Sequence, residues 1–155
     1  MKETFMKEAI KEAKKAYKED EIPIGCVIVS NGEIIGRGHN RVEQNQNPLH
    51  HAELLAIEEA VGKIGSWRLI DCDLYVTLEP CAMCAGALVH SRIRQVYFGA
   101  YDKKRGCCSS IMTLPQTEEF NHYVEIEGGI LEKECLSLIQ SFFQDLRRRK
   151  KERQN

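Results

Sequence analysis

The beginning of the chain carries apolar and charged positions with the spacing of an amphipathic helix. Residues 2 to about 19 place apolar side chains on one face, while lysines and glutamates cover the other. Pro23 ends this pattern. Two apolar runs follow, at 26–30 and 33–38, and they flank Asn31-Gly32, a strong two-residue hairpin turn. The pattern therefore predicts a helix followed by a pair of antiparallel strands.

Beyond the hairpin, strand-like and helix-like patterns alternate. Residues 39–48 are polar and rich in asparagine and glutamine, and we predict an irregular, site-forming loop there. A helix is predicted from Ala52, with Gly62 and Gly65 marking its end. The alternation favours an α/β fold whose partly parallel sheet is covered on both faces. The remaining predicted elements are strand 74–79, helix 82–91, strand 95–100, a weaker strand near 123–130 and a helix from 131 to about 150.

Length and composition agree with one globular domain. The chain has 155 residues, near the usual size of a compact domain, so we expect a single domain over residues 1–155. Apolar residues make up 43% and charged residues 29%, which excludes a disordered chain and a bilayer protein. The charged N-terminal segment lacks the apolar run of a signal peptide, and no stretch approaches the roughly 20 apolar residues of a membrane span. We therefore expect a cytoplasmic protein with no membrane partner.

The net charge of the chain gives little overall attraction to a polyanion. It is -1 at pH 7, so nucleic-acid binding would have to come from local basic patches. From charge alone, the basic cluster near the C-terminus is more simply interpreted as a solvated helix end whose cations complement the helix dipole. This cluster consists of Arg147, Arg148, Arg149, Lys150, Lys151 and Arg153.

Two short motifs bring together residue types that bind zinc. His51-Ala-Glu53 and Pro80-Cys81-Ala-Met-Cys84 each stand at a predicted helix start, where free amides and the positive dipole end favour thiolates and carboxylates. One helix and one strand separate the motifs, a unit that can return the second helix beside the first. His51, Cys81 and Cys84 supply the three ligands of a catalytic zinc site that leaves the fourth position to water. Glu53 would then carry protons in a hydrolytic reaction.

The Cys-x-x-Cys motif by itself would also suit a redox pair or half of a structural zinc site. A structural site needs a fourth ligand, and the adjacent Cys107 and Cys108 are poorly placed to face one metal together. A thioredoxin-like redox site would give no role to His51 or Glu53. In the reducing cytoplasm, the other cysteines are interpreted as packing residues rather than as disulfides. These are Cys26, Cys72 and Cys135.

With these motifs established, the sequence resembles a known superfamily. His51-x-Glu53 together with Pro80-Cys81-x-x-Cys84 resembles the signature of the zinc-dependent nucleoside and nucleobase deaminases. Further similarity covers nearly the whole chain and is to bacterial tRNA-specific adenosine deaminases, which convert the wobble adenosine of an anticodon to inosine. The segments that carry it are 23–25, 38–40, 66–69, 74–79, 83–87, 98–100, 120–122 and 142–143.

The resemblance implies a three-layer α/β/α cytidine-deaminase-like fold around a five-stranded mixed sheet. It also implies a hydrolase with one Zn²⁺ per subunit, a homodimer with each active site near the subunit interface, and a tRNA anticodon stem-loop as substrate. The target adenosine would be flipped into a pocket, where Asn40 would contact it and Ile24 and Leu78 would help to form the wall. The positions at which the family contacts the anticodon loop are Asp102, Lys104, Asn121, His122, Phe143 and Arg147.

Residue type alone permits simpler roles for these positions, so their functional roles rest on the resemblance. The simpler roles are a turn or loop cap for Asn40 and Asp102, core packing for Ile24, Leu78 and Phe143, and a surface position for His122 and Arg147.

The chain departs from the family pattern at two places. Leu49 and His50 stand where small or hydroxyl residues are usual, and His50 makes the metal ligand ambiguous by one position. We assign His51 because it alone gives the His-x-Glu spacing. Cys107 and Cys108 replace small residues in a loop that is expected to lie near the RNA.

Two other functions are compatible with the same motifs. A deaminase of a free base or nucleotide, such as a guanine or cytosine derivative, would share the zinc ligands, although the basic helix end and the aromatic C-terminal residues favour RNA. A zinc-stabilised RNA-binding module without catalysis belongs to a different class. It predicts that Glu53 can be replaced by glutamine without loss of function.

Overall fold

A mixed five-stranded sheet forms the central layer of the protein. The computed structural model describes residues 1–154. Its strands lie in the order β2-β1-β3-β4-β5, with β1 antiparallel to β2 and β3, and β4 parallel to β3 and β5. The predicted mixed sheet, with the hairpin as its antiparallel part, is confirmed. The strands are β1 Gly25–Ser30, β2 Glu33–His39, β3 Cys72–Leu78, β4 Gln95–Ala100 and β5 Glu125–Gly128.

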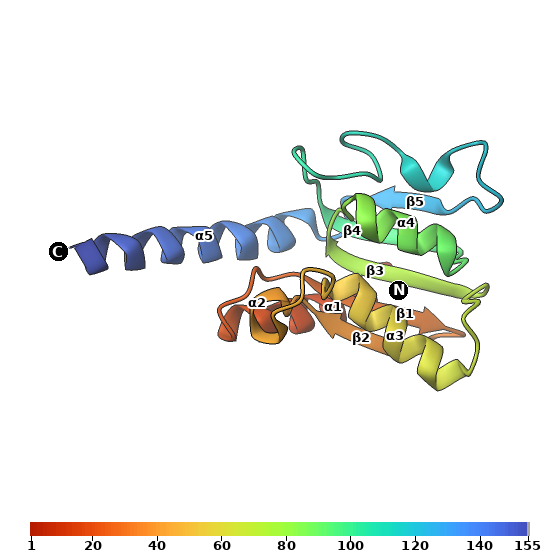
Figure 1. The fold of residues 1–155 in the computed structure, drawn as a ribbon, viewed down its shortest axis with the longest axis horizontal. Helices are drawn as coiled ribbons and strands as arrows, with labels where there is room; N and C mark the ends of the chain where they lie inside the picture. Colours follow the sequence, from red (N-terminus) through yellow and green to blue (C-terminus); the bar gives the residue numbers. More distant parts are fainter. Residues whose placement is uncertain (155) are drawn as a thin grey trace.

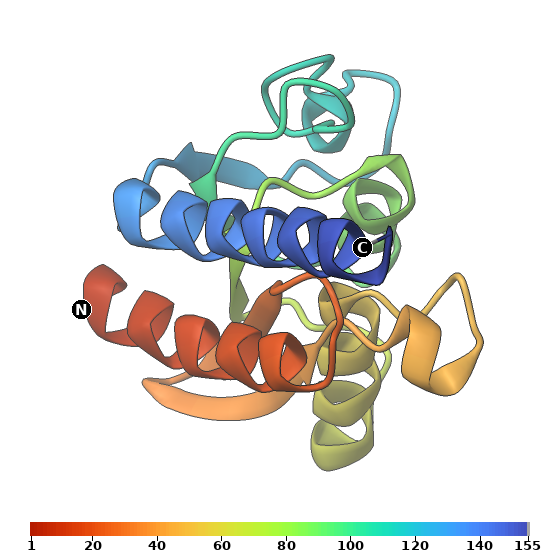
Figure 2. The same ribbon diagram turned by 90° about the vertical axis from the view of Figure 1, so that its left-hand side faces the viewer.

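Two helices cover each face of the sheet, which completes the predicted three layers (Figures 1 and 2). One face carries α1 and α5, which run side by side in the same direction (Figure 2), and the other carries α3 and α4. Within residues 1–154, none of the helices has both the length and the apolar character needed to span a bilayer. The helices are α1 Lys2–Lys18, α2 Val42–Asn45, α3 Ala52–Ile64, α4 Ala82–His90, the 3-10 helix η1 Leu114–Gln116 and α5 Glu132–Gln154.

The strand β1 shows how the sequence builds both halves of the core. Its side chains alternate between the two faces of the sheet, with the period of two that a strand imposes. Cys26 and Ile28 pack in the cluster beneath α3 and α4, whereas Val27 and Val29 pack in the cluster beneath α1 and α5. An uninterrupted apolar run is therefore what a strand covered on both faces requires.

The ends of the predicted elements agree with the structure except at a few places. Asn31 and Gly32 both have positive φ, at 49° and 76°, as expected for a type I′ hairpin turn. Gly65, with φ 77°, ends α3, so the prediction that Gly62 also marks the end was wrong. The helix α5 continues to Gln154, beyond the predicted end near 150.

The segment 39–48 contains the short helix α2, so the prediction of a wholly irregular loop there was wrong. The backbone amides of Glu43 and Gln44, in the first turn of α2, donate hydrogen bonds to the buried carboxylate of Glu21, at 3.2 and 2.7 Å. Glu21 lies more than twenty residues earlier in the sequence. A long-range cap of this kind stabilises a helix whose own sequence gives no periodic signal.

The helix α3 lies unusually close to β2 because both surfaces carry small residues. A Cβ atom at Gly36 would come within 2.3 Å of the Ala56 carbonyl oxygen, and one at Gly38 within 2.3 Å of the Ala52 carbonyl oxygen. On the helix side, Ala52, Ala56 and Ala60 are fully buried at helical spacing. This close approach fixes how near the first turn of α3 lies to the sheet.

The C-terminal helix α5 is attached to the end of α1. The Tyr17 hydroxyl donates a hydrogen bond to Asp145, and Arg149 donates to Asp20 at 2.8 Å. The rings of Tyr17 and Phe142 pack edge to face, with their centroids 5.5 Å apart. Beyond these contacts α5 projects past the rest of the molecule (Figure 1).

A charged cluster joins the end of β2 to α1. The imidazole of His39 lies between two carboxylates: Nδ1 is 3.5 Å from Glu12 Oε1, and Nε2 contacts Glu19. These contacts, first with Glu12 and then with Glu19, raise the pKa of His39 although burial opposes them. The hydrogen bonds from His39 and Lys15 outweigh the burial of Glu12 and lower its pKa to about 2.

We predict that His39→Gln destabilises the protein most strongly at mildly acid pH. Because the folded-state pKa of His39 is raised above 6.5, its stabilising contribution is full below that pH and disappears as pH rises through the folded-state value. At pH 5.5 the variant should lose about 1.5–3 kcal/mol of unfolding free energy, as for hydrogen bonds to charged groups. Urea unfolding at pH 5.5 and 9 measures this difference. A loss that does not depend on pH would contradict this prediction.

Candidate metal centre

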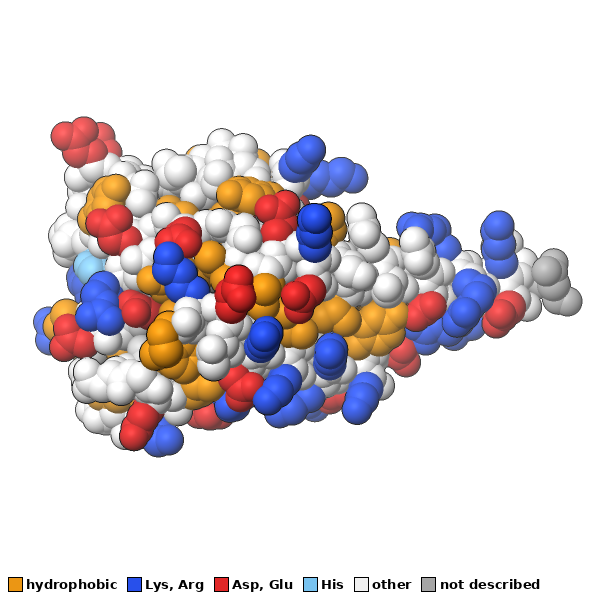
Figure 3. Space-filling model, turned by 180° about the vertical axis from the view of Figure 1, so that it is seen from behind, with side chains coloured by type: hydrophobic (Ala, Val, Ile, Leu, Met, Phe, Trp, Pro, Cys, Tyr) orange, Lys and Arg blue, Asp and Glu red, His pale blue; other side chains and the backbone are white. Residues whose placement is uncertain are grey.

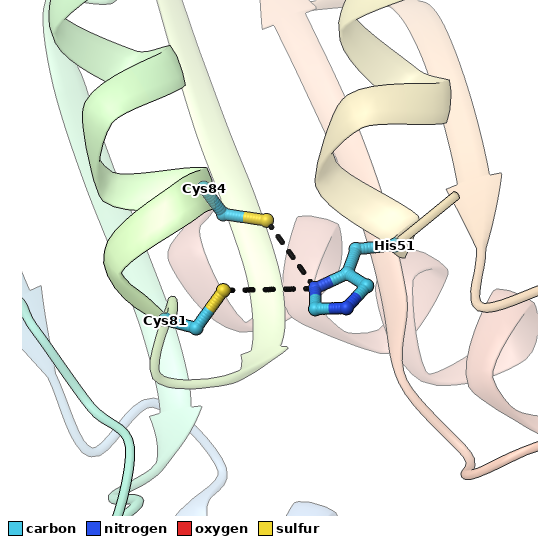
Figure 4. A group of neighbouring side chains, drawn as sticks. All are labelled: His51, Cys81 and Cys84. Carbon is cyan, nitrogen blue, oxygen red and sulfur yellow. Dashed lines mark hydrogen bonds between the residues drawn. The ribbon is translucent and has the colours of Figure 1, made fainter. Parts of the chain in front are cut away.

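Two helix starts meet at one edge of the sheet and bring three predicted ligands together. His51 is the N-cap of α3 and Cys81 is the N-cap of α4, and both residues have extended backbone conformations. Cys84 lies three residues after Cys81, on the first turn of the same helix. The side chains of all three point toward one another (Figure 4). Neither His51 nor Cys81 makes a side-chain hydrogen bond to the end of its own helix. Their donor atoms are therefore available to a metal ion.

The spacing of the donor atoms fits zinc. The Sγ atoms of Cys81 and Cys84 each lie 3.6 Å from Nδ1 of His51, and the three donor atoms all lie within 4.8 Å of one another. Tetrahedral zinc, with bonds of about 2.3 Å to sulfur and about 2.0 Å to nitrogen, would separate sulfur from nitrogen by about 3.5 Å and the two sulfurs by about 3.8 Å. One imidazole nitrogen and two sulfurs are also the donors that zinc prefers, so these residues can hold the ion.

The environment of Cys81 favours the thiolate that metal binding requires. A hydrogen bond from Cys84, followed by one from His51, lowers the pKa of Cys81 to about 3. The pKa of Cys84 is raised, chiefly because its thiol donates to Cys81 and because it is buried. The contact with Cys81 raises the pKa of His51. The three groups therefore share their protons, and a bound cation would replace those protons.

Glu53 provides a buried carboxyl group beside the three ligands. It lies on the first turn of α3, two residues after His51, and its side chain is only 4% exposed. Burial raises its pKa to about 7, and the nearby Cys81 thiolate raises it as well. A carboxyl group that titrates near neutral pH can both accept and donate a proton under cellular conditions.

A cavity of about 460 Å³ adjoins the metal centre, and we call it the site cavity. Four of the predicted site residues line it: Ile24, Asn40, His51 and Phe143. The Asn40 side chain is 5% exposed, and among the described residues its Oδ1 has no hydrogen-bond partner. A buried acceptor without a partner is costly, so it marks a position at which a ligand can donate. The full lining is Asp20, Glu21, Ile22, Ile24, Asn40, Val42, Glu43, His51, Arg105, Phe142, Phe143 and Leu146.

Other predicted substrate-binding residues lie outside this lining. Leu78 packs against the core cluster beneath α1 and α5. The Asp102 carboxylate accepts hydrogen bonds from the amides of Lys104 and Arg105, and His122 Nε2 donates to the Ile93 carbonyl at 2.7 Å. Their contacts with a substrate therefore stay predictions, as do those of the exposed residues. The exposed residues are Lys104, Asn121 and Arg147.

No pattern in the sequence singles out Arg105, yet this residue lines the site cavity together with His51. It stands next to the predicted Lys104 in a run of three cations, and residue type does not distinguish them. Only the path of the loop decides which of the three turns toward the cavity. Glu21 and Leu146 also line the cavity without having been predicted.

The two departures from the family pattern do not enter the ligand group. The ring of His50 lies against the side-chain amides of Asn45 and Asn47, at 2.9 and 3.2 Å, and the ligand group contains His51 instead. Cys107 and Cys108 are buried free thiols, and neither joins the three donors.

Comparison with known proteins gives consistent relationships. The model of the cytidine and deoxycytidylate deaminase zinc-binding region matches residues 1–100. The tRNA-specific adenosine deaminase of Bacillus subtilis is 55% identical over 149 residues, which cover 96% of this chain and 92% of that protein. A solved structure from studies of A-to-I editing by tRNA:A34 deaminases at the wobble position is 39% identical, with a TM-score of 0.84, and the match covers 87% of this chain and 98% of that chain. The guanine deaminase of Nitrosomonas europaea has the same fold at 22% identity, with a TM-score of 0.79 over 90% of this chain and 83% of that one.

We predict that His51→Ala and Cys81→Ala each abolish zinc retention, because a remaining pair of ligands cannot hold the ion against dialysis. Metal analysis of the purified protein should fall from about one zinc per chain to a small fraction of that. His50→Ala is the matched control, and its zinc content should equal that of the unmodified protein. If His50→Ala lost zinc as fully as His51→Ala, the assignment of His51 would be wrong.

Proposed function

Because the chain belongs to the cytidine and deoxycytidylate deaminase zinc-binding family, we propose that it is a tRNA-specific adenosine deaminase. This zinc-dependent hydrolase converts adenosine at the wobble position of an anticodon, with one water molecule, to inosine and ammonia. The observation that carries the proposal is the meeting of His51, Cys81 and Cys84 beside the buried Glu53, at the wall of a cavity. The similarity to the Bacillus subtilis enzyme extends over 96% of the chain and supports the choice of substrate.

The chemistry divides between the metal and Glu53. When bound by His51, Cys81 and Cys84, zinc supplies a Lewis acid that makes water nucleophilic at neutral pH. The Glu53 carboxylate takes the proton from the attacking water and delivers it to N1 of the adenine ring. It then carries the second proton to the amino group at C6, which leaves as ammonia. A pKa of about 7 suits both directions of transfer.

Asn40 is the residue best suited to recognise the nucleoside. Its buried Oδ1, without a partner among the described residues, can accept a hydrogen bond from a hydroxyl or amino group of the bound nucleoside. Ile24 lines the same cavity and offers an apolar surface to the base. In this proposal Leu78 supports the wall from the core rather than touching the base.

The helix α5 favours an RNA substrate over a free base. It contributes Phe142, Phe143 and Leu146 to the site cavity. Phe143 is 37% exposed, so a neighbouring base can stack on its ring. The same helix continues into the basic segment 147–153, and lysine and arginine side chains outnumber acidic ones on the face of the projecting end that Figure 3 shows. A free base needs neither feature, whereas an anticodon stem-loop has both unstacked bases and phosphates.

Further contacts with the anticodon loop are proposed for residues around the cavity. Arg147 follows Leu146 on α5, and Lys104 precedes Arg105, so each stands next to a lining residue. Asn121 and His122 lie in the connection that leads to β5. Asp102 contributes by shaping its loop. A protein that acts on tRNA also works where tRNA is translated, so we propose the cytoplasm as its location.

A homodimer is part of the proposal, since an apolar groove lies between α3 and α4. Its volume is about 530 Å³, and the Trp67 side chain beside it is 51% exposed. Exposed apolar grooves of this kind are typical of protein interfaces. Leu49 also lines the groove, two residues before His51, so a second subunit bound there would adjoin the metal centre. The lining is Leu49, Leu54, Ile57, Val61, Trp67, Met83, Gly86, Ala87, His90 and Ser91.

We predict that the zinc-loaded protein forms inosine in an anticodon stem-loop with adenosine at the wobble position. Free guanine and cytidine should release ammonia at least about a hundredfold more slowly, since they cannot use the contacts along α5. Glu53→Gln is the control: it should keep zinc and the fold but lose at least about a hundredfold in rate, because the proton carrier is gone. Reaction with guanine or cytidine but not with the stem-loop would exclude the tRNA function. Undiminished function in Glu53→Gln would favour a non-catalytic RNA-binding module.

We predict that Gly86→Glu converts the dimer to a monomer. A Cβ atom at Gly86 meets nothing within 4 Å in a single subunit, so the substitution leaves the monomer intact while it places a charge in the groove. Gly62→Glu is the matched control, because Gly62 also has open space on its helix but lies outside the groove lining. Light scattering should report the mass of a dimer for Gly62→Glu and half that mass for Gly86→Glu. A dimer in both variants would exclude this groove as the interface.

A further inference from the structure

The carboxylate of Glu79 is buried and has no part in the proposed deamination reaction. It follows the last residue of β3 and precedes Pro80 and Cys81, and its side chain is only 2% exposed. A buried carboxylate is costly unless several donors satisfy its oxygens. Here all the donors come from a single segment, residues 102–110, which we call the 102–110 loop.

Five hydrogen bonds join Glu79 to this loop. Oε1 accepts from the Asp102 amide at 3.0 Å and from the Ser110 hydroxyl. Oε2 accepts from three consecutive amides, those of Cys108, Ser109 and Ser110, at 3.2, 2.8 and 2.8 Å. Converging backbone N–H groups of this kind form a concave anion-binding arrangement, which is filled here by a side chain of the protein itself.

The loop is shaped to fit around this carboxylate. A Cβ atom at Gly106 would lie 2.2 Å from Cδ of Glu79, so only glycine allows the loop to close over it. The Cys107 amide donates to the Pro80 carbonyl at 2.9 Å, which attaches the loop to the residue just before the ligand Cys81. The Asp102 carboxylate tightens the beginning of the loop through the amides of Lys104 and Arg105, both at 3.2 Å. The path of the loop is therefore set from its two ends.

The consequence of this path is the position of Arg105. Of the three consecutive cations in the loop, Arg105 is the one that lines the site cavity, together with His51 and Asn40. Its guanidinium can bind a phosphate through two parallel hydrogen bonds, a geometry that a lysine cannot offer. The cation that meets the substrate is thus selected by the fold of the loop and not by the sequence of charges.

We propose that Glu79 is a positioning residue for substrate binding: by fixing the 102–110 loop it holds Arg105 at the site cavity, where Arg105 binds a phosphate of the RNA backbone next to the target nucleotide. This role rests on the proposed function. It would make Glu79 a further determinant of the enzyme's specificity for a polynucleotide substrate. The hydrogen bonds of the Glu79 carboxylate go to the 102–110 loop, so its role is to position and not to react.

The first experiment compares kinetic constants of the zinc-loaded variants with the anticodon stem-loop. Glu79→Gln keeps the volume, but its amide has one acceptor oxygen and turns an NH₂ group toward backbone N–H donors. We expect KM to rise by about tenfold, with kcat within about twofold and with zinc content unchanged. Ser110→Ala removes a single donor and should raise KM by a smaller factor. Unchanged KM, or loss of zinc together with kcat, in these variants would overturn the proposal.

A double-mutant cycle tests whether Glu79 acts through Arg105. Arg105→Ala should raise KM by about as much as Glu79→Gln, and the double variant should be no worse than either single variant. Lys103→Ala is the matched control, since it removes a cation of the same loop that does not line the cavity, and it should leave KM within about twofold. Additive effects of Glu79→Gln and Arg105→Ala would show that the two residues act separately and would overturn the proposal.

Amide hydrogen exchange tests whether Glu79 holds the 102–110 loop, and it does so without the deamination assay. In Glu79→Gln the amides of residues 102 and 108–110 should exchange faster than in the unmodified protein, while those of β3 and α4 should be unchanged. Unchanged exchange in the loop would overturn the proposal. If the unmodified protein did not act on the stem-loop, the proposed function would fail, whereas the exchange result would still decide whether Glu79 holds the loop.

Discussion

The first turns of α3 and α4 must reach the same point at one edge of the sheet, and the rest of the protein is arranged to satisfy this requirement. Three donor atoms have to lie about 3.5–3.8 Å apart for tetrahedral zinc to bind them. They come from two helices that are separated in the sequence by the strand β3. The glycines of β2 let α3 sit close to the sheet, and the turn after β3 leads directly into the Cys81 cap. Because a metal ion binds only the folded arrangement, its binding energy stabilises the fold.

The proposed catalytic and recognition residues come from different kinds of structure. The metal ligands and Glu53 stand on helix starts packed against the sheet, where small errors of position are suppressed by the core. The proposed substrate contacts include Asn40 before α2, residues of α5 and residues of the 102–110 loop, and all three segments contribute to the lining of the site cavity. The Glu79 carboxylate connects the two groups, since it immediately precedes the metal-binding turn and holds the loop.

The sequence predicts those parts of the protein whose causes are local. An uninterrupted apolar run predicts β1, and Asn31-Gly32 predicts its turn, because strand and turn each depend on adjacent residues. The ligands are predictable because His-x-Glu and Cys-x-x-Cys fix short spacings on helix starts. The helix α2 is not, because its cap is Glu21, far away in the sequence. Arg105 is missed for the same reason, since the carboxylate of Glu79, distant in sequence, holds the loop that decides which of three neighbouring cations lines the cavity.

The interpretation of individual residue types has a similar limit. Leu78 and Phe143 are both apolar, yet one packs in the core and the other is partly exposed at the cavity. Asp102 and His122 are both polar, and their hydrogen bonds within the protein cannot be read from residue type. The surroundings of each side chain follow from how its segment lies relative to the sheet, and that is a property of the whole topology.

The continuity of α5 has a mechanical consequence. One unbroken helix forms part of the cavity wall through Phe142 and Phe143 and then extends beyond the body as a basic arm. Because the backbone hydrogen bonds of a helix tie each turn to the next, the aromatic wall and the basic arm cannot be placed independently of each other. The contacts of Asp145 with Tyr17 and of Arg149 with Asp20 fix both of them at once, at the end of α1 and just beyond it. The position of the wall and the direction in which the arm points are thus set by the same few contacts.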